Sequence, residues 1–203
     1  MRFSLLCILL LVNDPVPCPG QGWVLKRDKK DITIWVREQA DSLLKEYKAR
    51  ALISHPIQTV FDFLADVERH PQWVYRCSGL TIIENGGEDH VKYHTSYDIP
   101  WPRKDRDLTA ETRFIRHEGG EKIEIITRNV NVDYPLEEDV VRMPRYREWV
   151  ILEKMDTHST VFKSEGFTDP GGNAPTRLVN MFLVDGVYHS VMKIRELLDD
   201  QAD

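Results

Sequence analysis

The C-terminal part of the chain constrains the fold most strongly, because it holds one long segment with helical periodicity. Its apolar side chains recur at steps of three and four residues, the spacing that places them on one face of an α-helix. They are Val184, Val187, Val191, Ile194 and Leu198. Between Pro175 and Leu198 there is no proline, so a helix of about 24 residues and about 36 Å is expected. Such a helix is long enough to cross a whole sheet.

The region before this helix alternates between apolar and polar residues, which is typical of half-buried strands. Turn signals at Asn85-Gly86-Gly87 and Gly119-Gly120 separate several of these runs. Strands are expected at 31–37, 47–53, 80–84, 91–97, 108–114, 122–130, 147–152 and 160–167. A short helix is expected to begin at Ser54 as N-cap and to end at His70-Pro71. The predicted fold class is α+β, with about eight or nine antiparallel strands and one long C-terminal helix.

The N-terminus differs from the rest of the chain. An apolar run of ten residues, Phe3 to Val12, follows Arg2, and this is too short to span a bilayer but typical of a signal peptide. Gly20-Gln-Gly22 offers a cleavage site, so we predict a signal peptide at 1–22 and one domain at 23–203. The protein is then exported to a periplasmic or extracellular space, and it is cytoplasmic if this segment is not a signal peptide. Removal of the leader leaves Cys77 alone, so no internal disulfide is expected.

Several classes of function are disfavoured by composition and motifs. A formal net charge of −6 argues against nucleic-acid binding, and we expect a monomer. The chain has no G-x-S-x-G, G-x-x-x-x-G-K, G-x-G-x-x-G or H-E-x-x-H motif. His90 and His94 lie four apart in an expected strand, which is too far for a typical zinc pair. We therefore predict no catalytic residues, no metal and no cofactor.

Ordered signatures make the chain similar to a known family. They are Asp31-Ile-Thr-Ile-Trp-Val-Arg37, Trp73, Pro100-Trp-Pro-Arg-Lys-Asp-Arg-Asp107, Val141-Arg-Met-Pro-Arg-Tyr146 and Asp169-Pro-Gly-Gly-Asn-Ala-Pro175. From Trp23 to about Leu198 the chain resembles START (steroidogenic acute regulatory protein-related lipid transfer) domains, and among them the short bacterial-type members. The resemblance implies a helix-grip fold, in which a curved antiparallel sheet wraps a long C-terminal helix over an apolar cavity. It also implies non-catalytic binding and carriage of a lipid, a sterol-like molecule or another hydrophobic small molecule.

Alternation on two neighbouring strands suggests which side chains meet a ligand. The uncharged sets are assigned to the inner face. They are Val91, Tyr93, Thr95 and Tyr97 on one strand, and Leu108, Ala110, Thr112 and Phe114 on the next. In sterol-binding relatives an acidic residue and an arginine pair on these strands. The resemblance places Thr95 and Thr112 at those positions, where a Thr–Thr hydrogen bond or a ligand hydroxyl would replace the charges.

The full set of predicted ligand contacts is Tyr93, Thr95, Tyr97, Trp101, Thr112, Arg142 and Asn180. The alternative for Arg142 is a salt bridge to an acidic residue near its strand end. Loops near 98–106 and 166–175 are expected to gate the cavity. Trp101 is a candidate for transient membrane contact, or else it packs under its own loop.

Two other functions stay open. The wider superfamily includes cyclases and dehydratases of aromatic polyketides, and such an enzyme needs a titratable group with a perturbed pKa inside the cavity. The inward-facing list contains hydroxyls and an amide, with no clear acid or base. A third possibility is a chaperone or sensor that binds a partner protein, which an exposed apolar patch around Trp101 would favour.

Overall fold

The computed structural model describes residues 22–40 and 42–201, so the signal peptide predicted at 1–22 lies outside the described residues except for Gly22. No helix within these ranges is both long and apolar enough to cross a membrane. The strands are β1 (Val24–Lys29), β2 (Ile32–Gln39), β3 (Ser42–Ile53), β4 (Cys77–Asn85), β5 (His90–Tyr97), β6 (Asp105–Arg116), β7 (Lys122–Asn129), β8 (Val140–Arg142), β9 (Arg145–Lys154) and β10 (Thr160–Asp169). The helices are α1 (Ile57–Ala65), α2 (His70–Trp73) and α3 (Thr176–Asp199), with 3₁₀ turns η1 (Val67–Arg69) and η2 (Glu118–Gly120).

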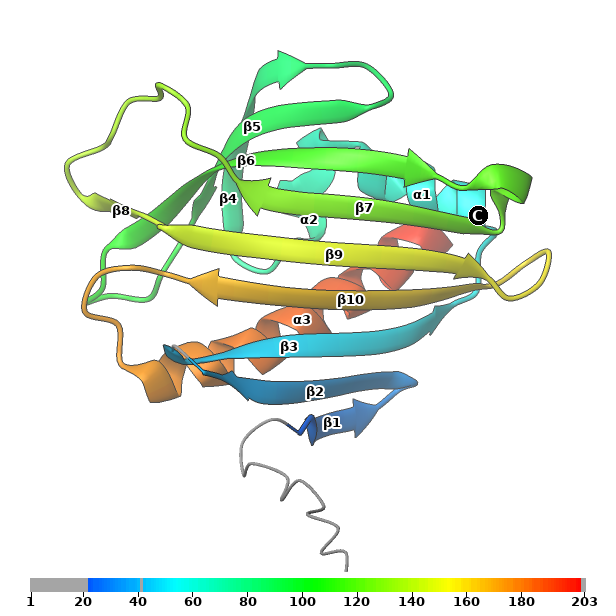
Figure 1. Ribbon diagram of the computed structural model, residues 1–203, viewed down its shortest axis with the longest axis horizontal. Coiled ribbons are helices and arrows are strands. Elements are labelled where there is room, and N and C mark those ends of the chain that lie inside the picture. Colours follow the sequence, from blue (N-terminus) through cyan, green and yellow to red (C-terminus); the bar gives the residue numbers. More distant parts are fainter. Residues whose placement is uncertain (1–21, 41, 202–203) are drawn as a thin grey trace, which may run out of the picture.

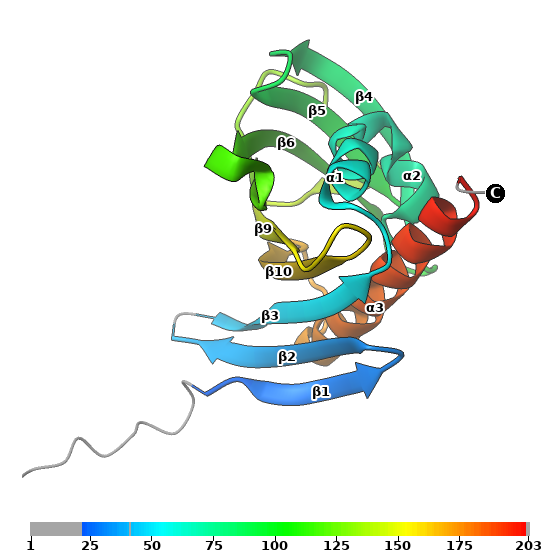
Figure 2. The same cartoon turned by 90° about the vertical axis from the view of Figure 1, so that its right-hand side faces the viewer.

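The ten strands form one curved sheet in the order β1-β2-β3-β10-β9-β7-β6-β5-β4, with β8 beside β6. Figure 2 shows the sheet bending around the helices, which all lie on its concave side. Helix α3 crosses behind the sheet in Figure 1. This is the predicted helix-grip arrangement, an α+β fold with one long C-terminal helix. The pairing is antiparallel except between β8 and β6, which run parallel.

The helical segment after β3 differs from the prediction at both ends. Helix α1 begins at Ile57 with Pro56 as its N-cap, and no side chain caps it, so Ser54 does not have the predicted role. His70-Pro71 does not end the helical segment but starts α2, where proline occupies the first turn. Proline lacks the N–H that the first turn leaves unpaired in any helix, so it favours a start as readily as a stop.

The main core lies at one end of the concave face. There α1 and the C-terminal part of α3 pack on β2, β3 and β9. Only three side chains of α3 are fully buried, Val191, Ile194 and Leu198. Arg195 also fixes the C-terminal part of α3 to β3, since its guanidinium donates to the carbonyl of Leu52 at 2.6 Å. The earlier turns of α3 are partly buried, with Leu183, Val184 and Val187 packed against the core.

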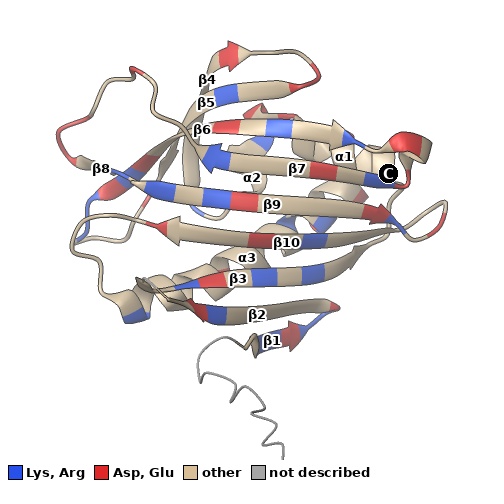
Figure 3. Cartoon of the chain, viewed as in Figure 1, with Lys and Arg blue, Asp and Glu red and all other residues tan. Residues whose placement is uncertain are grey.

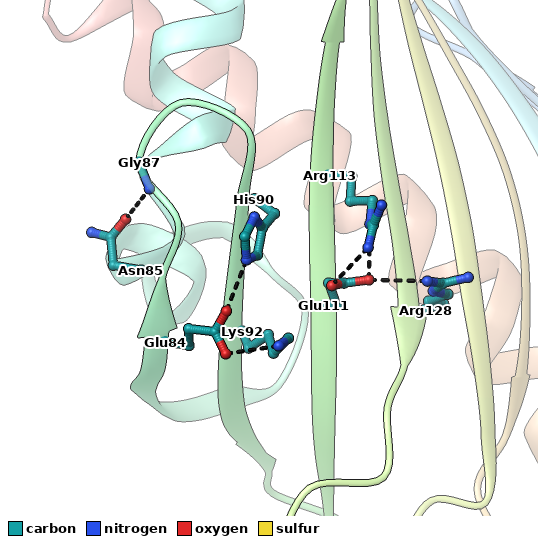
Figure 4. A network of polar contacts seen from close by, with 8 residues as sticks. All are labelled: Glu84, Asn85, Gly87, His90, Lys92, Glu111, Arg113 and Arg128. Carbon is teal, nitrogen blue, oxygen red and sulfur yellow. Dashed lines mark hydrogen bonds and ion pairs between the residues drawn. The ribbon is translucent and has the colours of Figure 1, made fainter.

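Lys, Arg, Asp and Glu residues recur along most strands (Figure 3). Figure 4 shows two clusters that include such residues. The carboxylate of Glu111 accepts from Arg113 at 3.0 Å and from Arg128 at 3.1 Å, and Glu84 accepts from Lys92 at 2.7 Å. Exposed pairs of this kind each stabilise a fold by about 0.2–1 kcal/mol. The concave face is mostly apolar and uncharged, as the alternation predicts, although Glu148 and Arg106 also lie on it.

Candidate functional site

A cavity of about 300 Å³ lies between the concave face of the sheet and α3. Small-molecule sites span about 300–1,000 Å³, so this volume is at the lower end. Near α1 the wall is apolar, with Leu64, Ile125, Val150, Phe162 and Ile194. At the other end the mouth is formed by loop residues 99–106 and 168–175 and by the first turns of α3. Leu178, Phe182, Leu183, Gly186, Val187 and Ser190 form the helix side of the wall.

A band of polar side chains crosses the middle of the cavity. The strand register aligns Tyr47, Gly166, Glu148, Thr127 and Thr112 in one row across β3, β10, β9, β7 and β6. The Tyr47 hydroxyl donates to Glu148 Oε1 at 2.5 Å, and the Tyr146 hydroxyl donates to Glu148 Oε2 at 3.0 Å. Thr112 Oγ1 is 2.8 Å from Thr127 Oγ1 and 3.2 Å from the Tyr93 hydroxyl. Nearly every polar group of the band is thus paired within the wall.

Gly166 makes the contact between Tyr47 and Glu148 possible. A Cβ at this position would lie 2.6 Å from Tyr47 Cε1 and 3.0 Å from its hydroxyl oxygen, closer than van der Waals contact. The Tyr47 ring instead lies across the glycine and reaches the carboxyl group on the next strand. The sequence therefore needs glycine here for space rather than for backbone freedom.

Glu148 and His70 are titratable groups in the cavity wall with displaced pKa values. Burial raises the pKa of the Glu148 carboxyl above its ordinary value, although hydrogen bonds from Tyr47 and Tyr146 partly oppose the shift. Burial lowers the pKa of His70 to about 4, and its ring packs edge-on against Trp73 and Tyr93. The prediction that the cavity offers no acid or base is therefore wrong.

Three of the seven predicted contacts line the cavity: Tyr93, Tyr97 and Thr112. Thr95 is buried but lies outside the lining set, since its hydroxyl donates to the Gly79 carbonyl at 3.0 Å and contacts Cys77 Sγ at 3.3 Å. The predicted Thr95–Thr112 hydrogen bond does not form. The register pairs Thr95 with Leu108, and it pairs Thr112 with Val91, so the two threonines are too far apart along the strands.

Trp101 and Asn180 also lie outside the cavity wall. Trp101 is 91% exposed in the loop between β5 and β6. Asn180 Oδ1 accepts from the backbone N–H of Lys45 at 2.9 Å, so this amide fixes α3 to the start of β3. The residues of α3 that line the cavity include 178, 179, 182 and 183. Successive residues of a helix are about 100° apart around its axis, so Asn180, two positions after 178, faces away from the cavity.

Arg142 lies on the convex side in the alternative role, a salt bridge. Its Nε and Nη2 donate to the two carboxylate oxygens of Asp107 at 2.8 and 2.7 Å. His94 Nε2 lies 2.9 Å from Asp107 Oδ2, and the His94 ring stacks on Tyr134 with centroids 4.1 Å apart. Burial raises the pKa of Asp107, but the hydrogen bonds from Arg142 and His94 outweigh it and the net shift is downward. This cluster holds the 130–139 loop against the sheet.

Sequence reasoning missed several lining residues, of which Tyr47, Tyr146, Glu148 and the arginines Arg76, Arg103 and Arg106 carry polar chemistry. One signal for Glu148 was present. Tyr146, Glu148, Val150 and Leu152 share one strand face, so a lone acid in an otherwise uncharged set marks either a buried network or a site. Arg106 also had a signal, because it shares a strand face with Leu108 and Thr112, whereas Arg76 and Arg103 lie in irregular segments.

Replacing Gly166 with alanine should lower the free energy of unfolding by about 1–3 kcal/mol, because overpacking displaces the Tyr47 ring from Glu148. Urea denaturation measures this change. Gly79→Ala is the matched control, since a Cβ there meets nothing within 4 Å. Equal stability of the two variants would contradict the assigned role of Gly166.

Replacing Glu148 with glutamine should change how stability depends on pH. A carboxyl whose folded pKa is raised holds its proton more tightly in the folded state, so its contribution falls as pH rises above the ordinary value of 4.5. The variant should therefore gain stability relative to the native chain as pH rises from about 4.5 to 8 in urea titrations. Glu165→Gln, at an exposed position of β10, should show no such trend. A constant difference for Glu148→Gln would exclude a raised pKa.

Replacing Arg142 with alanine should lower the free energy of unfolding by about 1.5–3 kcal/mol, because a buried carboxylate loses two charged hydrogen bonds. The amount of bound ligand should stay unchanged, since the side chain lies outside the cavity. Arg128→Ala removes an exposed arginine from Glu111 on the same face and should cost no more than about 1 kcal/mol. A loss of ligand without a loss of stability in Arg142→Ala would restore the ligand-contact hypothesis.

The comparisons with known proteins agree with this geometry. Residues 53–128 match the family model described as polyketide cyclase/dehydrase and lipid transport. The chain is 22% identical to the phosphatidylcholine transfer protein of Rattus norvegicus over 83% of this chain and 79% of that one. The crystal structure of a STAR-related lipid transfer protein fragment from Xanthomonas axonopodis matches with a TM-score of 0.80 and 22% identity, over 88% of this chain and 99% of that one.

A more distant structural match is to an enzyme. The Zhui aromatase/cyclase from Streptomyces sp. R1128 aligns with a TM-score of 0.54 and 14% identity, over 77% of this chain and 92% of that one. This likeness is one of fold alone. Taken together with the helix-grip architecture and the cavity, the similarities show that the chain has a START-like fold.

Proposed function

We propose that the protein binds a lipid or another amphipathic small molecule in the cavity and carries it without chemical change. The observation that carries this proposal is the wall itself, which is largely apolar and lies between the sheet and the partly buried turns of α3. Transfer of apolar surface into such a site gains about 25 cal/mol per Å². A ligand would add apolar contacts to the turns of α3 that are only partly buried.

Entry requires the mouth to open. The loop of residues 98–104 and the loop of residues 170–175 border it, and Gly171 and Gly172 in the second loop both have positive φ. Next to Trp101 lie Arg103 and Lys104, and an exposed indole beside cations is suited to a membrane interface. In this proposal the protein is an exported monomer that contacts membranes transiently to load and release its ligand.

A second candidate, a cyclase- or dehydratase-like enzyme, is favoured by one observation. Glu148 lies in the cavity wall, and burial raises its pKa, which is the direction of shift that a carboxyl group acting as a general acid requires. The hydroxyls of Tyr47 and Tyr146 are already bonded to Glu148, so they position this carboxyl group. An enzyme of this kind would return a changed molecule, whereas a carrier releases the molecule it took up.

Native mass spectrometry of the purified full chain, followed by organic extraction, tests the proposal. A stoichiometric lipid-like mass is expected. Leu183→Arg should reduce occupancy about tenfold or more, because a charge would enter the apolar wall, and tenfold corresponds to about 1.4 kcal/mol. Met181→Arg is the control on the same helix, since Met181 is exposed and not in the wall.

Circular dichroism checks that both variants keep their helix and sheet content. Full occupancy in Leu183→Arg would show that the ligand binds elsewhere. A native chain that is empty and takes up no fluorescent lipid would exclude the carrier, and a bound small molecule that emerges altered would favour the enzyme.

A further inference from the structure

Arg106 is a buried cation in the wall of the cavity. It lies on β6 on the same face as Thr112, opposite Tyr97 on β5, and its exposed fraction is 6%. Burial lowers the pKa of its guanidinium, and Arg103 nearby acts in the same direction. A buried charge is costly unless it is paired, so its partners decide what the site is for.

Within the described residues, the partners of Arg106 are all neutral carbonyl groups. Its Nε donates to the carbonyl of Pro170 at 2.7 Å, and its Nη1 donates to the carbonyls of Lys104 and of Asp105. No carboxylate forms an ion pair with it there, and its Nη2 donates no hydrogen bond. A Cβ on Gly172 would lie 3.6 Å from this Nη2, so glycine keeps the space beside the nitrogen open.

Two further arginines add to the positive charge of the mouth. Arg103 is half-buried, Arg76 is exposed, and both belong to the cavity wall. Neither forms an ion pair within the described part of the chain, although Arg76 Nη1 reaches the carbonyl of Asp98 at 3.4 Å. This concentration of cations stands out in a chain with a net charge of −6.

The nearby acids form no ion pair with Arg106, although the charge of Asp105 partly opposes the lowering of its pKa. Asp105 accepts from the backbone N–H of Ile99 at 2.8 Å, and Asp169 pairs with Arg145 at 3.2 Å. Asp98, Asp105 and Asp169 lie outside the lining set. Among the lining residues that the structure describes, Glu148 is the one acid, and its raised pKa favours the neutral form. Within the described residues, the cavity lining therefore contains three arginines, Arg76, Arg103 and Arg106, and no carboxylate forms an ion pair with them.

We propose that Arg106, with Arg103 beside it, binds the oxyanion of an anionic amphiphile, a carboxylate or a phosphate group. The guanidinium is suited to this because its planar N–H donors match both anions. The apolar tail would extend past the polar band toward Leu64, Phe162 and Ile194. This inference rests on the proposed carrier function and narrows its ligand class.

Three probes with the same sixteen-carbon tail test the inference: palmitate, hexadecyl phosphate and hexadecanol. The delipidated full chain should bind at least one of the two anions about tenfold more tightly than the alcohol in fluorescence displacement titrations. A preference for palmitate or for hexadecyl phosphate distinguishes the carboxylate from the phosphate. Because the tail is constant, the ratio reports the head group alone.

Variants that replace an arginine of the cavity wall with neutral glutamine test where the anion binds. Arg106→Gln should reduce the ratio of anion to alcohol affinity about tenfold while hexadecanol binding stays unchanged. Arg103→Gln should reduce the ratio about threefold, and it serves as the second variant, because Arg106 also joins two loops and its replacement can affect folding. Lys104→Gln is the control in the same loop, since its amino group pairs with Asp139 at 3.2 Å and it is not in the wall.

Two results would overturn the inference. Equal affinity for the anions and the alcohol, or a ratio that Arg106→Gln and Arg103→Gln leave unchanged, would exclude the oxyanion site and leave the carrier function intact. No binding of any of the three probes, in a chain that also co-purifies with no lipid, would overturn both.

Discussion

The packing of α3 across the concave face of the curved sheet is the constraint on which the structure depends. Val191, Ile194 and Leu198 are the side chains of this helix that become fully buried. The sheet does not close on itself, since its end strands β1 and β4 are its two edges, and so a helix must cover the concave face. Full burial is confined to the last turns of the helix, whereas the turns before them are only partly buried. The cavity lies between these partly buried turns and the sheet.

The polar band shows how such a space keeps a defined shape. Buried polar groups stabilise a fold only when their partners are in place, and here those partners come from different strands. The Glu148 carboxyl on β9 accepts from Tyr47 on β3 across Gly166 of β10. The hydroxyls of Thr112 and Thr127 join β6 to β7. These bonds join strands across the middle of the wall, so the same groups that stabilise the fold also line the cavity.

Periodicity in the sequence predicted the elements whose burial is regular. The long helix and the faces of β5 and β6 were predicted correctly, because one side of each meets the interior. Strand β1 was missed because nearly all its side chains are exposed and do not alternate. Strand β8 was also missed, because its three residues are all half-buried and it pairs with β6, which is distant in the sequence. Register was a further limit: alternation gives the face of Thr95 and Thr112 but not their offset along the strands, and this offset decides that they do not meet.

The Arg106-Asp107 pair illustrates how strand geometry turns adjacent charges into separate sites. Successive side chains of a strand point to opposite faces, so these two residues cannot neutralise each other. Asp107 lies on the convex side, where it is 2% exposed and paired with Arg142 and His94. Arg106 lies on the cavity side, where its partners are carbonyl oxygens. Because Asp107 is paired on the convex side, it does not neutralise the guanidinium of Arg106, which faces the cavity. An anion that entered the cavity would neutralise this guanidinium.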